Sequence, residues 1–208
     1  MTGLRSDTRA APPADPDTPV PAAAPIVLPP WAVAGSRRRA HIARVVALIG
    51  TWATHLAVSP VERQAWHDAA LWHDALRDAP EEELRAIVDA SAPWILGEVP
   101  GGVGFLHGPA AAARLAAGGE RREPVLDAIR WHTVGSAQWG ATGRALYMAD
   151  FLEPGREFAH EERAVLAQRV PRDFDSVFRD VVELRVKWAT EAGKALAPRT
   201  VELWNAVR

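Results

Sequence analysis

The sequence of 208 residues contains no cysteine. This absence excludes disulfide bonds, iron–sulfur clusters, cysteine-based zinc sites and thiol nucleophiles, since each of them needs a cysteine sulfur. Any bound metal ion must therefore be held by histidine, aspartate or glutamate side chains. Seven histidines and 26 acidic residues are available for that purpose.

A long hydrophobic run and a strong excess of one charge are also missing. The longest largely apolar stretch, residues 45–58, contains His55 and is shorter than the about 20 residues that a membrane-spanning helix needs. The N-terminal region has no uninterrupted apolar segment of the kind found in signal peptides. The formal net charge of −2 provides no field that would gather nucleic acid non-specifically. We expect a cytoplasmic protein that binds neither membranes nor nucleic acid.

Proline is concentrated at the N-terminus. Residues 1–33 contain eight of the 17 prolines, interleaved with alanine, aspartate and threonine. This composition disfavours helix and core formation, so we predict a disordered tail over 1–33 and a single domain over 34–208. We expect removal of the tail to leave folding and catalysis nearly intact. Its only plausible docking residues are Ile26, Val27, Leu28 and Trp31.

From Arg37 onward, apolar residues recur at helical spacing and strand-like alternation is scarce, which predicts an all-α domain. Ser59-Pro60-Val61-Glu62 combines a capping serine, a proline at the first helical position and a glutamate, and predicts a helix that runs to about Arg77. The helices expected after it run from Glu81 through Ala90, from Gly108 to Gly118, and over about 123–132, 142–153, 161–169 and 174–196, with a last turn or two from Thr200.

The helix predicted from Pro60 to Arg77 carries the first candidate for chemistry. His73 falls on its apolar stripe and therefore faces the core, and Asp74 follows about 100° further round the helix. A buried, unpaired carboxylate is energetically costly, so the pair needs a partner. A metal ion fits this need, and a buried structural His–Asp network is the alternative. The stripe contains, at spacings of three and four residues, Trp66, Ala69, Ala70, His73 and Leu76.

A second His-Asp dipeptide, His67-Asp68, lies six residues upstream. It is rotated by about 120° relative to the first pair, and we expect it on a solvated face. Helical periodicity alone does not separate the two pairs cleanly. His55 and His160 are expected on solvated surfaces as well.

Four other polar residues stand among apolar neighbours at points where helices begin, end or pack. His41 lies near the start of the first helix, and Asp150 ends the apolar segment ALYMAD. His107 opens the alanine-rich helix, and His132 ends the helix that begins near 123. Such positions allow the side chains to point at a common cleft.

The order of these residues, His first, then His-Asp, then His, His and Asp, resembles the pattern of the HD superfamily of phosphohydrolases. The surrounding segments resemble more narrowly the bacterial YqeK-type symmetrical diadenosine tetraphosphate hydrolases, which bind iron and yield two ADP. This resemblance covers nearly the whole domain, from about Arg38 to Asn205. The segments that carry it are AALWHD (69–74), LHGPAAA (106–112), DAIRWHTVG (127–135) and YMADFLEPGR (147–156).

The resemblance implies a role for each matching residue. It implies metal ligation by His41, His73, Asp74 and Asp150, whereas His107 and His132 either complete a second metal site or contact the phosphates. Asp74, His107 and His132 would take part in catalysis. Nucleotide contacts are implied, in addition to His107 and His132, for Arg38, Thr133, Arg156, Thr200 and Asn205. Ile42, Trp139 and Trp204 depart from the family's pattern and leave the shape of the nucleoside pocket open.

Elementary chemistry favours the same reaction. Two divalent ions bridged by a carboxylate activate water at neutral pH and hold the attacking and leaving oxygens of a phosphoryl transfer. A His/Asp ligand set without thiolate suits iron, with manganese or cobalt as alternatives. Arginine pairs with phosphate through two parallel hydrogen bonds. We therefore expect one or two divalent ions, iron before the others.

These observations predict a metal-dependent hydrolase that cleaves a dinucleoside polyphosphate symmetrically, with diadenosine tetraphosphate as the first candidate. Two alternatives stay open: an HD hydrolase that acts on another nucleotide, and a non-catalytic nucleotide-binding HD module. Trp131 or Trp139, which flank the His132 segment, is a weaker candidate for stacking on adenine. A homodimer is compatible with the sequence, which does not determine the oligomeric state.

Overall fold

The computed structural model describes residues 26–99, 103–156 and 158–208, so most of the predicted N-terminal tail lies outside the described residues. Within these ranges the secondary structure is helical and contains no strand, which confirms the all-α prediction. No helix in the described part of the chain is long and apolar enough to cross a bilayer. The helices are α1 (Ser36–His55), α2 (Pro60–Trp72), α3 (Glu81–Ser91), α4 (His107–Ala117), α5 (Glu123–Trp131), α6 (Ala141–Leu152), α7 (His160–Arg169), α8 (Phe174–Glu191) and α9 (Pro198–Val207), with short 3-10 helices at Pro93–Gly97 and Val103–Phe105.

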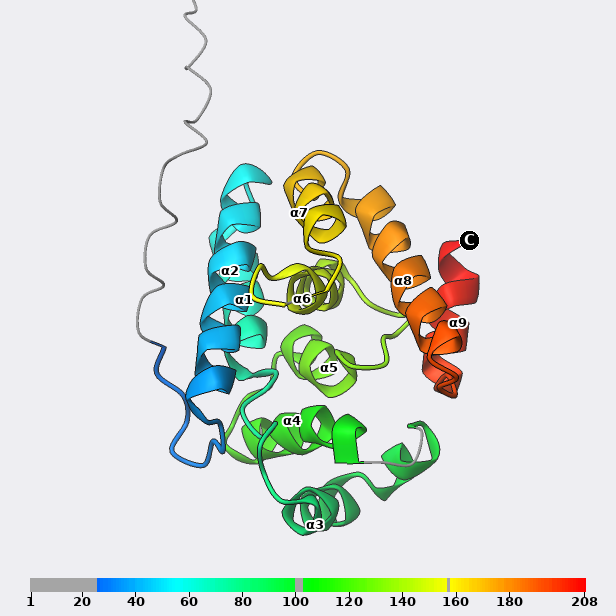
Figure 1. Ribbon diagram of the computed structural model, residues 1–208. Helices are drawn as coiled ribbons and strands as arrows, with labels where there is room; N and C mark the ends of the chain where they lie inside the picture. Colours follow the sequence, from blue (N-terminus) through cyan, green and yellow to red (C-terminus); the bar gives the residue numbers. More distant parts are fainter. Residues whose placement is uncertain (1–25, 100–102, 157) are drawn as a thin grey trace, which may run out of the picture.

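Helix α6 forms the centre of the bundle. It packs against α1, α2, α5, α7 and α8, and Figure 1 shows it inside the bundle beside α5, with α1 and α2 on one side and α8 and α9 on the other. Every residue from Ala145 to Leu152 is buried. A helix that is apolar almost all round is expected in such a central position. Asp150, near its C-terminal end, is therefore placed deep within the domain.

Helix α2 ends at Trp72, five residues before the predicted end, so the prediction of a helix to Arg77 was wrong. In a continued helix the Ala70 carbonyl would accept a hydrogen bond from the Asp74 N–H. It accepts instead from the His73 ring nitrogen Nδ1, at 2.8 Å. Residues 73–78 form turns, and His73 and Asp74 thus lie where the chain leaves the helix. The start of α2 agrees with prediction, because the Ser59 side chain accepts from the Glu62 N–H.

Helix α8 also ends earlier than predicted, at Glu191 instead of 196. Gly193 adopts a left-handed conformation with φ of 65°. The Lys194 N–H donates to the Ala189 carbonyl at 2.8 Å, and the Gly193 N–H donates to the Thr190 carbonyl at 3.0 Å. This pair of bonds is the Schellman arrangement, which terminates a helix at a glycine.

The described end of the N-terminal segment is attached to the domain. The Val33 N–H donates to the Ala75 carbonyl at 2.8 Å, and the Asp78 N–H donates to the Val33 carbonyl at 3.2 Å. Trp31 and Val33 pack against the core, which confirms Trp31 as a docking residue. These contacts support the turns at 73–78 that carry His73 and Asp74.

Candidate metal centre

The structure brings together all six residues that the sequence singled out as metal ligands. His41 comes from α1, His73 and Asp74 from the turn after α2, and Asp150 from α6. His107 is the first residue of α4, and His132 follows the last residue of α5. All six are buried, with at most 7% of any residue exposed.

Asp74 lies between two groups of histidines. Its Oδ1 atom is 3.0 Å from Nε2 of His107 and 3.4 Å from Nε2 of His132. Its Oδ2 atom is 3.6 Å from Nε2 of His41 and 3.6 Å from Nε2 of His73. Asp150 extends the second group, with Oδ1 3.2 Å from Nε2 of His41. Asp74 thus faces one group of histidines with each of its two carboxylate oxygens.

Hydrogen bonds orient the histidine rings for ligation. Nδ1 of His73 donates to the Ala70 carbonyl at 2.8 Å, and Nδ1 of His132 donates to the Ile129 carbonyl at 2.7 Å. With the proton on Nδ1, the neutral His73 ring directs an Nε2 lone pair at the Asp74 carboxylate. A lone-pair donor facing a carboxylate repels it unless a cation lies between them. This donor set, with backbone acceptors behind the rings, therefore fits a divalent metal ion, and two groups of three ligand atoms lie close enough for that purpose: His41, His73 and Asp74, and Asp74, His107 and His132.

The pKa values of His73 and His41 are shifted in opposite directions. Burial lowers the pKa of His73 to about 4, which keeps this ring neutral at pH 7. Burial also disfavours charge on His41, but its hydrogen bonds to Asp150 and Glu153 outweigh that effect and raise its pKa to about 9. Burial opposes ionisation of Asp150, yet the adjacent Arg156 guanidinium and His41 hold the pKa of this carboxyl well below its usual range. The cluster thus stabilises positive charge next to two ionised carboxylates.

Glu153 is a component that the sequence analysis missed. It is buried, accepts from Nδ1 of His41 at 3.1 Å, forms an ion pair with Arg44, and accepts from the Gly155 N–H at 2.7 Å. A carboxylate behind a ligating imidazole fixes the ring and increases its basicity. The available signal was spacing, since Glu153 follows Asp150 by three residues and Arg44 follows His41 by three residues, which puts each pair on one helix face.

Three arginines surround the carboxylates. Arg38 donates to Asp74, and Arg156 donates to the side chain and the main-chain carbonyl of Asp150. Arg185 was not predicted. Its guanidinium lies 4.0 Å from the centre of the Tyr147 ring, donates to the Thr133 carbonyl at 3.0 Å, and approaches Asp150 to 3.8 Å. A charged residue on the buried face of α8 was the signal for it.

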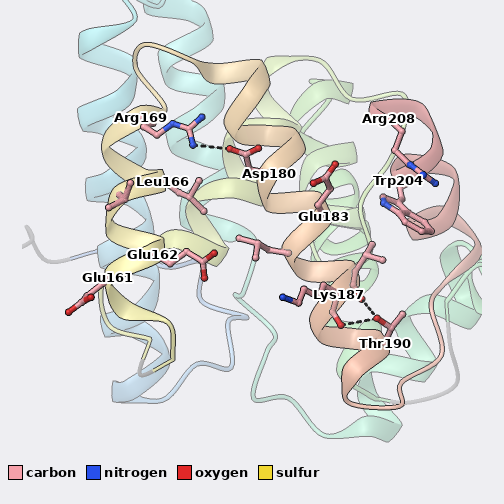
Figure 2. A pocket seen from close by; sticks show the side chains of 13 residues that line it. Glu161, Glu162, Leu166, Arg169, Asp180, Glu183, Lys187, Thr190, Trp204 and Arg208 are labelled. Atoms are coloured by element: carbon pink, nitrogen blue, oxygen red, sulfur yellow. Dashed lines mark hydrogen bonds and ion pairs between the residues drawn. The ribbon is translucent and has the colours of Figure 1, made fainter.

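A basic cavity opens at His41. It has a volume of about 660 Å³ and is lined by Arg37, Arg38, Arg44 and Arg156 among others. These arginines provide a local positive charge, although the net charge of the chain is −2. A larger groove of about 900 Å³, shown in Figure 2, lies between α7, α8 and α9 and contains none of the six clustered residues. Cavity size alone therefore does not locate the metal centre.

Three further predicted nucleotide contacts lie at different distances from the cluster: Thr133 is next to it, whereas Thr200 and Asn205 are on α9. Thr133 is adjacent to the cluster, with its hydroxyl 3.3 Å from Nε2 of His132. The Thr200 hydroxyl donates to the Val134 carbonyl at 2.7 Å and so attaches α9 to the turn after α5. Asn205 is exposed on α9. Their contacts with nucleotide stay predictions.

Asp68 and the tryptophans Trp131 and Trp139 lie in surroundings that differ from those expected. Asp68 was expected on a solvated face but is buried, because Arg122 pairs with it at 2.8 Å and Gln64 donates to it at 2.8 Å. His67 is exposed, as are His55 and His160, in agreement with prediction. Trp131 and Trp139 are both buried, which leaves neither ring open for stacking on adenine.

The fold and the cluster define an HD-superfamily protein. A solved structure from Clostridium acetobutylicum, described as a predicted HD superfamily hydrolase involved in NAD metabolism, superposes with a TM-score of 0.69 and 25% identity over 83% of this chain and 89% of that one. No protein-family model matches the chain.

Curated relatives identify the family more narrowly. A protein of Halalkalibacterium halodurans named symmetrical bis(5'-nucleosyl)-tetraphosphatase is 32% identical over 140 residues, which are 66% of this chain and 72% of that protein. A Bacillus subtilis protein of the same name is 32% identical over 93 residues, 43% of this chain and only about half of that protein (48%). The chain belongs to the family of symmetrical bis(5'-nucleosyl)-tetraphosphatases.

Proposed function

We propose that this protein is a metal-dependent phosphohydrolase that cleaves dinucleoside polyphosphates symmetrically, with diadenosine tetraphosphate as its substrate and ADP as its product. The observation that carries the proposal is Asp74, whose two carboxylate oxygens face two separate groups of histidines. Membership of the family supports the choice of reaction. A module that only binds nucleotide has no need for a bridged set of ligands.

The ligands we assign are the six clustered residues, and the metal we assign first is iron. A bound divalent ion supplies an activated water and neutralises charge that develops on phosphate oxygens. Glu153 holds the His41 ring, and the Ala70 and Ile129 carbonyls hold His73 and His132, so the ligand nitrogens are oriented before any ion binds. Metal analysis of protein purified without added metal tests this assignment, and manganese or cobalt in place of iron would correct it.

Arginines bind the polyphosphate in this proposal. Arg38 and Arg156 are partly exposed at the basic cavity and also contact Asp74 and Asp150, so each can reach a phosphate held beside the cluster. A guanidinium donates two parallel hydrogen bonds to a phosphate group. The alignment of the phosphate chain against these groups determines which phosphorus atom meets the water.

The reaction has a simple balance. The water oxygen forms a bond to one of the two inner phosphorus atoms, the bond from that atom to the central bridging oxygen breaks, and the released ADP keeps the bridging oxygen. One water is consumed for two ADP molecules. The test is chromatography of products from a panel that contains diadenosine tetraphosphate, nucleoside triphosphates and NAD. The proposal expects fast turnover of the first compound to ADP alone, and preferential hydrolysis of another member would overturn it.

A further inference from the structure

We propose that a second cavity, which shares Arg156 and Phe158 with the basic cavity, binds the nucleobase of the substrate. This inference rests on the proposed function and adds a base-binding site to it. The cavity has a volume of about 310 Å³, within the lower range of small-ligand sites. The residues that carry the argument are Asp150, Arg156, Phe158, Arg185, Trp188 and Lys194.

The second cavity is continuous with the metal centre. Asp150 forms part of its wall, and Arg156 and Phe158 line both this cavity and the basic one. A nucleotide whose phosphate lies at Asp150 and Arg156 can therefore extend into either cavity. The basic cavity contains three further arginines and suits phosphates, whereas the second cavity contains aromatic rings and suits a base.

The aromatic side chains form a preassembled platform. The rings of Phe158 and Trp188 lie 4.2 Å apart at an interplanar angle of 73°, and Phe151 packs against Trp188 at 5.4 Å and against Phe158 at 6.0 Å. Phe158 is 38% exposed, and Trp188 is partly exposed. Aromatic rings held in this way and open to a cavity stack on a base without a large loss of side-chain entropy.

The cations in the second cavity are placed for the adjoining phosphates. Arg185 has a buried guanidinium nitrogen, Nη1, that makes no hydrogen bond to any described residue, and this atom lies 3.8 Å from Asp150. Trp188 follows Arg185 by three residues on α8, so the two side chains share a helix face about 4.5 Å apart along the axis. Lys194 adds an exposed ammonium group beyond the end of α8. A nucleotide with its phosphate near Arg185 and its base at Trp188 would therefore lie along one face of α8.

Other tryptophans do not offer the same arrangement. Trp131 and Trp139 are buried, and Trp204 lines the groove of Figure 2, which shares no residue with the metal cluster. Trp94 is 56% exposed and packs against Trp131. It serves as a matched control, because it is an exposed tryptophan that contacts none of the residues of the second cavity.

The test compares ligands with and without a base on the metal-loaded enzyme. Binding of ADP and of inorganic pyrophosphate is measured by calorimetry for wild type, Trp188→Leu, Phe158→Leu, Trp188→Phe and Trp94→Leu. We expect Trp188→Leu and Phe158→Leu to weaken ADP binding on the order of tenfold or more, in line with the known strength of base stacking. Pyrophosphate binding should change less than about twofold in every variant, and Trp188→Phe and Trp94→Leu should bind ADP nearly as wild type does.

Unchanged ADP binding in Trp188→Leu, or an equal loss for ADP and pyrophosphate, would overturn the assignment. Equal thermal stability of Trp188→Leu and Trp188→Phe checks that folding does not account for the loss. Because ADP binding is measured without turnover, the result is independent of the reaction. A base-dependent loss in a protein that fails to cleave diadenosine tetraphosphate would contradict the proposed function and keep the base site.

Discussion

The two His-Asp dipeptides of the chain are chemically identical and only six residues apart, yet the histidines around them differ. The first, His67-Asp68, lies within α2, with 48% of the His67 side chain exposed and Asp68 paired with Arg122. The second, His73-Asp74, lies in the turn after α2, with both residues buried against three more histidines. Both aspartates are buried and each pairs with an arginine, Arg122 for Asp68 and Arg38 for Asp74, but only Asp74 also faces two separate groups of histidine nitrogens.

The largest expected effect separates the two aspartates. Asp74→Asn removes the charge shared by both groups of histidines, so we expect loss of bound metal and at least about a thousandfold loss of turnover. Asp68→Asn should keep metal and turnover and lower the free energy of unfolding by about 1–2 kcal/mol, because it weakens a partly exposed ion pair. Metal analysis, kinetics and denaturant unfolding of both variants measure the contrast. Similar metal loss from both would show that the wrong dipeptide has been assigned.

The next effect concerns the support of His41. Glu153→Gln leaves a group of the same size but removes the charge behind the ring, so we expect metal affinity to fall about 10- to 100-fold. Activity should recover at high metal concentration. Glu123→Gln is the control, because Glu123 is exposed and its ion pair among the described residues is with Arg130, at 3.3 Å, and not with a residue of the cluster. Competition with a chelator of known affinity gives both values, and an unchanged value for Glu153→Gln would remove Glu153 from the metal centre.

Arg156→Ala tests whether Arg156 binds phosphate without being needed to retain the metal. This change removes charged hydrogen bonds to phosphate, so we expect a higher KM, slower turnover and a loss of kcat/KM of about 10- to 100-fold. Metal content should stay as in wild type, since Arg156 supplies no ligand atom. Kinetics combined with metal analysis distinguishes the two roles. A fall in metal content would show that the contact with Asp150 supports the centre itself.

The features that could be predicted from the sequence are those that depend on residues close together in the chain. The cap at Ser59 and the apolar pattern of α6 are local, and they were predicted correctly. The end of α2 was not, because the hydrogen bond from His73 to Ala70 and the contacts of Val33 with Ala75 and Asp78 replace helical ones. Helical spacing could have drawn attention to Glu153 and Arg185. The distant partners of Asp68, Glu153 and Arg185, however, are not visible in the sequence.

The smallest effect comes from the N-terminal segment, where the structure leads to a different expectation from the sequence. Removal of residues 1–33 deletes the two main-chain hydrogen bonds of Val33 and the packing of Trp31. We expect the free energy of unfolding to fall by about 1–3 kcal/mol, with the His73-Asp74 turn affected more than His67-Asp68. Removal of residues 1–25 is the matched control. Equal thermal stability of the two truncated proteins would show that Trp31 and Val33 contribute little.

The most direct test of the account is hydrolysis of diadenosine tetraphosphate in water labelled with oxygen-18, with the products analysed by mass spectrometry. Attack at an inner phosphorus beside Asp74 and Asp150 predicts ADP as the only nucleotide, with one labelled oxygen in one of the two ADP molecules formed in each turnover. ATP together with AMP, or ADP without label, would contradict the assignment of this centre to symmetrical cleavage.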